Sequence, residues 1–135
     1  MTTPVKDLKG TTDAMLAKFK ELAINDNDKL LQAAATPAQR KELAAACGCT
    51  PADILAVANR ADLARIKGVS GVYSDLLEHA GVDTIKELAK RRPDHLFEKI
   101  AETNDTAKLT QRPPTAAMVE DWVTQAKGLP AMLSY

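Results

Sequence analysis

The sequence lacks a surplus of charge of either sign, and it lacks long apolar runs. Its 18 lysine and arginine residues balance 18 aspartate and glutamate residues. A protein dedicated to nucleic acids usually carries a basic excess, so only a local basic patch could serve that function here. No run reaches the roughly 18 apolar residues that a transmembrane helix needs, so we expect no membrane partner.

Other absences narrow the function further. Residues 1–10 contain no apolar stretch of the kind that marks a signal peptide, so we expect a cytoplasmic protein. Aromatic residues are scarce, with one tryptophan, two tyrosines and two phenylalanines. Proteins that bind single-stranded nucleic acid usually stack bases on aromatic side chains, and this chain has few to offer.

Metal and catalytic chemistry have little support. Only Cys47, Cys49, His79 and His95 could supply nitrogen or sulfur ligands, and one C-x-C pair falls short of the roughly four ligands of a structural zinc site. The chain has no glycine-rich phosphate loop and no nucleophile-elbow motif. We therefore expect no metal, no cofactor and no enzyme activity. An enzyme using the cysteines would require one of them to be exposed beside a histidine.

What the sequence does contain is helical periodicity. Apolar residues recur at helical spacing in about eight short segments, and no segment alternates as a strand does. Threonines precede several of these segments and predict N-caps, because their hydroxyls accept from free helical amides. These observations predict an all-α fold, a compact bundle of about eight short helices. Residues 104–111 are expected to form a polar loop.

The chain is organised around residues 61–81. Leu63 and Ile66 predict the end of one helix, Lys67 to Gly71 predict a tight turn, and a second helix follows. Glycine tolerates the backbone angles of such a turn, and the following helix dipole favours an anion at its start. This pattern is typical of a helix-hairpin-helix unit.

The same unit occurs twice in the sequence. Leu8-Lys9-Gly10 lies 58 residues before Ile66-Lys67-Gly68, and the segment near Thr50 resembles the one near Thr115. We interpret residues 1–58 as a first repeat, residues 59–130 as a second repeat packed on the first, and residues 131–135 as a frayed tail.

Eight segments carry a resemblance to a known family: Asn59–Leu63, Arg65–Val69, Tyr73–Glu78, Gly81–Thr84, Lys86–Leu88, Arg112–Pro114, Val119–Trp122 and Gln125–Lys127. They resemble the bacterial family catalogued as domain of unknown function 4332, which has tandem helix-hairpin-helix-like (SAM-like) repeats. The resemblance implies a bacterial protein of that fold. It implies little about activity, because fold likeness alone is only a weak argument for DNA binding.

Two functions remain open at this point. In the first, the turns bind the phosphates of double-stranded DNA without reading sequence, through eight residues: Arg65, Lys67, Gly68, Ser70, Gly71, Lys9, Gly10 and Thr12. In the second, the turns only join packed helices, and the protein is a protein-interaction or self-assembly module. A basic run at Lys86, Lys90, Arg91 and Arg92 fits a solvated helix end better than a binding face.

Overall fold

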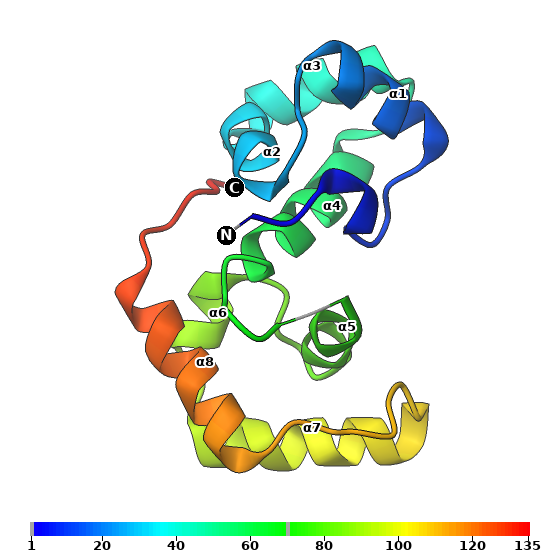
Figure 1. Cartoon of the computed structure of the whole chain (residues 1–135). Coiled ribbons are helices and arrows are strands. Elements are labelled where there is room, and N and C mark those ends of the chain that lie inside the picture. The colour runs from blue at the N-terminus through cyan, green and yellow to red at the C-terminus, as the bar shows by residue number, and fades with distance from the viewer. Residues whose placement is uncertain (1, 70) are drawn as a thin grey trace. The chain divides into compact units, whose positions relative to one another are not determined.

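The computed structural model describes residues 2–69 and 71–135, and within them the fold is all-helical, as predicted. The helices of the described chain are η1 (Val5–Asp7), α1 (Asp13–Glu21), α2 (Asn27–Ala33), α3 (Pro37–Cys47), α4 (Pro51–Leu63), α5 (Gly71–His79), α6 (Ile85–Ala89), α7 (Pro93–Ala107) and α8 (Ala116–Gly128). Figure 1 shows their order along the chain. The β-structure of these residues is limited to one isolated antiparallel bridge between Pro4 and Asp26.

The chain forms two compact units. The first unit contains Met1–Arg65 together with Ala131–Tyr135, and the second contains Ile66–Pro130. The repeat boundary inferred from sequence, between residues 58 and 59, falls inside α4, which belongs entirely to the first unit. That boundary concerns sequence duplication and stays a prediction.

Side-chain caps set most helix starts. The threonine hydroxyls at the N-caps of α1, α3, α4, α6 and α8, and the Asp26 carboxylate at that of α2, each accept from the amide three residues later. Thr36 with Gln39 and Thr50 with Asp53 form reciprocal capping boxes. These caps satisfy amides that have no partner inside the helix, which is why short sequence signals located the starts well.

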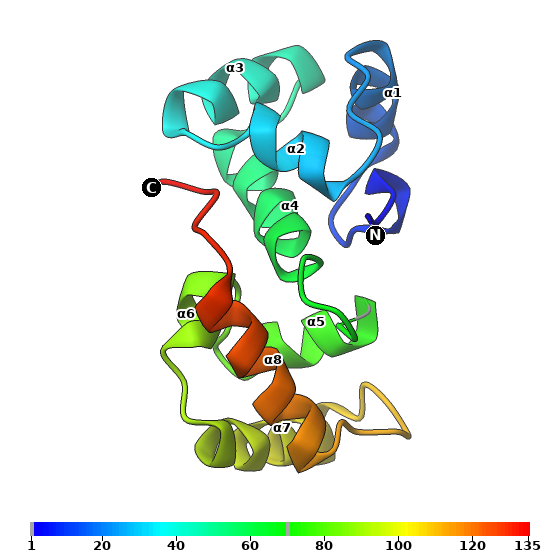
Figure 2. The same cartoon turned by 60° about the vertical axis from the view of Figure 1, so that its left-hand side comes forward.

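The core of the first unit is built on α4. This helix packs against both α2 and α3, which lie beside it in Figure 2, and buries Ile54, Val57, Ala58 and Ala61. Asn27 at the start of α2 is also buried. Its carbonyl oxygen accepts from the Thr3 amide at 2.8 Å, and its amide group donates to the Ala61 carbonyl at 3.2 Å.

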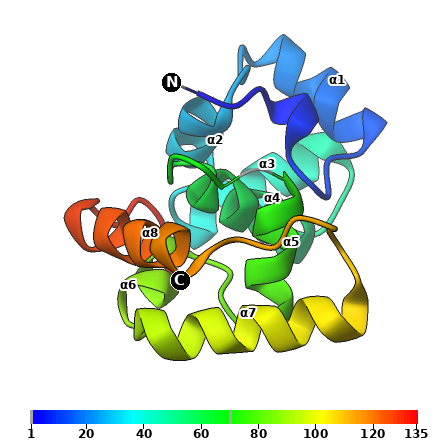
Figure 3. The same ribbon diagram turned by 60° about the horizontal axis from the view of Figure 1, so that its bottom comes forward.

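The core of the second unit is built on α8, which packs against α6 and α7. Figure 3 shows α7, the longest helix of the described chain, running beside α8 and α5. The buried face of α8 consists of Val119, Trp122, Val123 and Ala126. The Trp122 ring lies 5.4 Å from that of Tyr73, so the indole joins α8 to α5.

Two pairs of helices, each with one member in either unit, match in length. Both α1 and α5 have nine residues and begin 58 positions apart, and α2 and α6 also begin 58 apart. Both α4 and α8 have 13 residues, begin 65 positions apart and are capped by a threonine. Pro37 and Pro93, the first residues of α3 and α7, are 56 positions apart, and the offset then rises to 65 because α7 has 15 residues against 11 and a longer segment follows it.

The structure corrects two expectations about helix ends. The predicted loop 104–111 is wrong at its start, because α7 continues to Ala107 and ends at Lys108 with φ +51°. The Asn104 side chain donates to the Thr110 carbonyl and accepts from the Thr110 amide, so it holds the following segment against the helix. Ile66 lies outside α4, which ends at Leu63, although it is buried.

The C-terminal segment is bound rather than frayed. Its Ser134 amide donates to the Ala35 carbonyl at 2.8 Å. The buried Arg40 guanidinium donates to the carbonyls of Ala34, Ala35 and Ser134, at 2.9, 3.2 and 2.6 Å. Arg40 also lies 5.8 Å from the centre of the Tyr135 ring. One side chain thus completes the end of α2 and ties down the last residues.

Replacing Arg40 by methionine should lower the free energy of unfolding by about 3 kcal/mol, because a buried charged donor to three carbonyls is lost. Urea denaturation measures this change. Lys41→Met, at an exposed position on the same helix, is the matched control and should change stability little. Equal effects of the two substitutions, or a Ser134 amide that exchanges as freely as in an unfolded chain, would contradict this account of the tail.

Candidate functional site

The turn before α5 is bound to α8 through its backbone. The Lys67 amide donates to the Gln125 side-chain oxygen at 2.8 Å, and the Gln125 amide group donates to the Lys67 carbonyl at 3.1 Å. Gln125 is itself positioned by Asp121, whose carboxylate accepts from it at 2.8 Å. The Lys67 backbone is therefore occupied by the protein, while its side chain is exposed.

Gly68 follows in a conformation that only glycine adopts without strain, with φ +95°. A Cβ at this position would lie 3.2 Å from the indole nitrogen of Trp122. The turn therefore sits directly against the largest buried side chain of the second unit. This close approach gives the glycine a packing role that requires no ligand.

The turn before α1 is built in the same way. Gly10 has φ +92°, and a Cβ there would lie 3.4 Å from a Val57 methyl group. Gly10 and Gly68 are 58 residues apart, and Val57 and Trp122 are 65 apart, which are the offsets of the surrounding helices. Each glycine thus packs against the corresponding position of the helix that closes its own unit.

The two turns differ in what they could offer an anion. The Thr12 hydroxyl caps α1 by accepting from the Met15 amide, and Asp13 places a carboxylate in the first turn of that helix. The first turn of α5 has no acidic residue. Because a carboxylate at a helix start repels phosphate, α5 is the more suitable of the two for an anion.

The other predicted site residues are distributed as follows. Arg65 belongs to the first unit and forms an ion pair with Asp62 at 3.1 Å, with side chains only 11% and 7% exposed. Lys9 is exposed, and it interacts with another group of the protein. Gly71 begins α5, and its carbonyl accepts from the Ser74 hydroxyl. Ser70 lies outside the described residues.

The basic run in and after α6 contains both a side chain that is bonded within the protein and side chains that are exposed. Arg91 donates to the Gly81 carbonyl at 3.0 Å and lies 3.6 Å from the Glu87 carboxylate, so it holds the segment between α5 and α6. Lys86 and Lys90 are exposed. Part of the run therefore has a structural use within the second unit.

The cysteines are poorly placed for nucleophilic chemistry. Cys47 is buried and Cys49 is half-buried. Burial raises the pKa of both thiols, with a further rise at Cys49 from the Asp53 carboxylate. A raised pKa keeps a thiol protonated at neutral pH and so unreactive. Among the residues the structure describes, no three His, Cys, Asp or Glu side chains gather as metal ligands.

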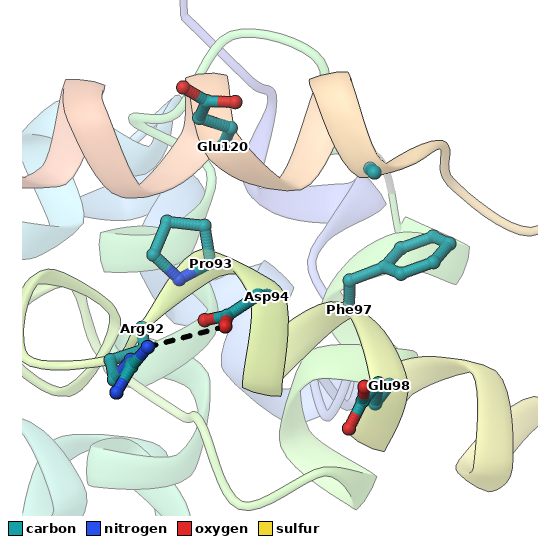
Figure 4. Close-up of a pocket in the computed structure, with 7 residues that line it drawn as sticks. Arg92, Pro93, Asp94, Phe97, Glu98 and Glu120 are labelled. Carbon is teal, nitrogen blue, oxygen red and sulfur yellow. Dashed lines mark hydrogen bonds and ion pairs between the residues drawn. The ribbon is translucent and has the colours of Figure 1, made fainter.

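A groove between α7 and α8 was not predicted from the sequence. It has a volume of about 580 Å³ and lies within the second unit. Figure 4 shows Pro93 and Phe97 in the space between the helices, with Glu120 on α8 to one side and Glu98 on α7 to the other. The i, i+4 spacing of Asp94 and Glu98 places them on one face of α7, but the groove itself depends on how α7 packs against α8.

A smaller groove of about 340 Å³ lies in the first unit. Leu22, Ile24 and Leu43 give it an apolar lining, and Leu22 is 51% exposed. No helix in residues 2–69 or 71–135 is both long and apolar enough to cross a membrane.

Replacing Gly68 by alanine should destabilise the protein by about 2 kcal/mol, because the residue would be strained at φ +95° and its methyl group would press on Trp122. Gly10→Ala should cost less, about 1 kcal/mol, because its contact with Val57 is looser. Thermal or urea unfolding measures both.

Gly128→Ala is the matched control for both substitutions, because Gly128 is helical and its Cβ would meet nothing within 4 Å. It should leave stability unchanged or raise it by up to about 1 kcal/mol. If Gly68→Ala behaved like Gly128→Ala, the close packing of the turn would be refuted.

Comparison with known proteins adds one relationship. No curated protein and no solved structure matches the chain. Residues 9–129 match the model of one family, which is nearly the whole length of the 135-residue chain. The chain belongs to the family described as domain of unknown function DUF4332.

Proposed function

We propose that the protein is a non-enzymatic protein-interaction module built from two helix-hairpin-helix-like repeats, whose glycine turns are structural joints. One observation carries the proposal: in each unit the positive-φ glycine of the turn packs against the corresponding position of the closing helix, Val57 or Trp122. Both glycines are also exposed on their other side, but this packing explains the glycine at each turn without a ligand, as expected of a joint.

Two helix pairs of equal length, and the shared offset of 58 residues at the starts of two pairs, support a duplication. Equal lengths for α1 and α5, and for α4 and α8, are what two copies of one unit would have. The extra residues of the second copy lie partly in α7, which has 15 residues against the 11 of α3, and partly in the longer segment between α7 and α8. We include in the proposal a cytoplasmic location in a bacterium, where the free cysteines would stay reduced.

The protonation and exposure of the cysteines, and the placement of the histidines, favour a binding function over catalysis. The two thiols have raised pKa values and little exposure, which leaves no activated sulfur nucleophile in the first unit. Histidines occur only at His79 and His95. Both are exposed on helix surfaces, and the ring of His79 is bonded to the Asp75 carbonyl of its own helix.

A protein partner is favoured over DNA by the charge of the second unit. The second unit has nine lysine and arginine residues against ten aspartate and glutamate residues, so neither its total charge nor its groove attracts phosphate. Arg65, expected to extend a basic patch at the turn, is held by Asp62. Backbone binding depends on the number of cations that neutralise phosphates, and this turn presents few.

Nucleic-acid backbone binding remains the second candidate, because one observation favours it. The first turn of α5 has no acidic residue, and the Lys67 side chain is exposed just before it. In this alternative, duplex DNA phosphates would be held by Arg65, Lys67, Gly68, Ser70 and Gly71, seconded by Lys9, Gly10 and Thr12.

Fluorescence anisotropy of labelled duplex DNA distinguishes the two candidates. We expect no saturable binding at near-physiological salt, and only weak binding at low salt that Lys67→Glu reduces no more than Lys99→Glu does. Lys99 is the matched control, since it is an exposed lysine on α7, away from the turn in sequence. Salt-sensitive binding that Lys67→Glu abolishes and Lys99→Glu preserves would replace the proposed function with the second candidate.

A further inference from the structure

One face of α7 carries a row of carboxylates. Asp94, Glu98, Glu102 and Asp105 follow one another at spacings of four, four and three residues, so they lie on one side of the helix. All four are exposed. At a rise of 1.5 Å per residue the row is about 16 Å long.

The carboxylates of this acidic row repel one another, and this repulsion destabilises α7. Like charges four residues apart destabilise a helix. Only the Asp94 carboxylate has an ion-pair partner among the described residues, Arg92, at 3.4 Å with both side chains mostly exposed. The pKa of Asp94 is lowered, mainly by a hydrogen bond from the His95 amide, so this carboxyl group stays ionised at neutral pH. In α3, the corresponding helix, Glu42 is the only acidic residue.

The row borders the groove between α7 and α8. Pro93, Phe97 and Ala116 give the groove an apolar floor, while Glu98 and Glu120 stand on its two sides without ion-pair partners in the described chain (Figure 4). A volume of about 580 Å³ lies within the range of sites that enclose a ligand. Arg92 also lines the groove, but it pairs with Asp94, so the groove combines an apolar surface with the uncompensated negative charge of Glu98 and Glu120.

We propose that this groove binds a basic amphipathic segment of a partner protein, with an apolar side chain on Phe97 and lysine or arginine side chains against Glu98 and Glu120. The inference rests on the proposed function and names the chemistry of its partner. Charge complementarity selects the occupant, since phosphate or an acidic peptide would be repelled by the carboxylates. A purely apolar segment would remove the carboxylates from water without pairing them. A helix that lays its apolar face into the groove meets both requirements.

The test uses the full chain and a labelled helical peptide of about five turns, with lysines and arginines along one face and leucines along the other. We expect saturable binding by fluorescence anisotropy that weakens as salt is raised. The Glu98→Gln and Glu120→Gln double variant should bind about tenfold more weakly, since each exposed ion pair contributes a few-fold. Asp83→Asn, an exposed carboxylate of the second unit outside the groove, is the matched control and should leave affinity unchanged.

The peptide tests the apolar floor without altering the protein. Replacing the central leucine of the peptide by serine should weaken binding. A scrambled peptide of the same composition should bind poorly, through charge attraction alone, so that its binding disappears as salt is raised. A thermal melt accompanies the double variant, and we expect an unchanged or higher midpoint, because Glu98→Gln removes repulsion along α7. A loss of affinity with a preserved melt therefore reports on the groove and not on folding.

Three results would overturn the inference. Equal affinities for the amphipathic and scrambled peptides would show that the peptide binds by nonspecific charge attraction and does not use the apolar surface of the groove. Equal effects of the groove variant and Asp83→Asn would place the binding elsewhere. Concentration-dependent self-association of the chain that the groove variant abolishes would make a second copy the occupant. None of these results comes from the DNA titration, which tests the proposed function. Failure of the groove proposal can therefore be distinguished from failure of the proposed function.

Discussion

The close approach of a left-handed glycine to the closing helix is the constraint on which the rest of each unit depends. Gly68 can turn the chain closely against Trp122 because it has no side chain, whereas Gly10 lies at ordinary contact distance from Val57 and is required by its positive φ. With the turn in place, Gln125 pairs with both backbone groups of Lys67, and Tyr73 on α5 reaches the indole. The positive-φ geometry of these turns therefore has a use within the protein itself.

The balance of positive and negative charge is the second feature that bears on function. The overall sum of zero conceals local differences, since α7 gathers exposed carboxylates while Arg40 and Arg65 are largely buried and occupied. Buried arginines act as hydrogen-bond donors to carbonyls or as ion-pair partners, and they add nothing to an outer basic face. Charge that remains free to meet a partner is therefore mostly negative around the α7–α8 groove.

Local signals predicted the helices well where their physics is local. The threonine caps and capping boxes depend on residues three positions apart, so Thr36 with Gln39 could be recognised from sequence alone. Predictions failed where a distant group decided the outcome. Asn104 resembles a loop residue, yet its side chain bonds to Thr110 and α7 continues past it. The final residues resemble a frayed tail until Arg40, 94 positions earlier, is found to bind Ser134.

The sequence by itself determined the all-helical class, the helix starts and the 58-residue spacing of the glycine turns, because these follow from periodicity, caps and backbone preferences of adjacent residues. Only the tertiary structure decided what the turns face and where free charge gathers. Whether Lys67 presents its amide to solvent depends on Gln125, 58 residues away. Whether Glu98 and Glu120 share a groove depends on how α7 packs against α8. Such relations arise from packing between segments, which no local pattern in the chain encodes.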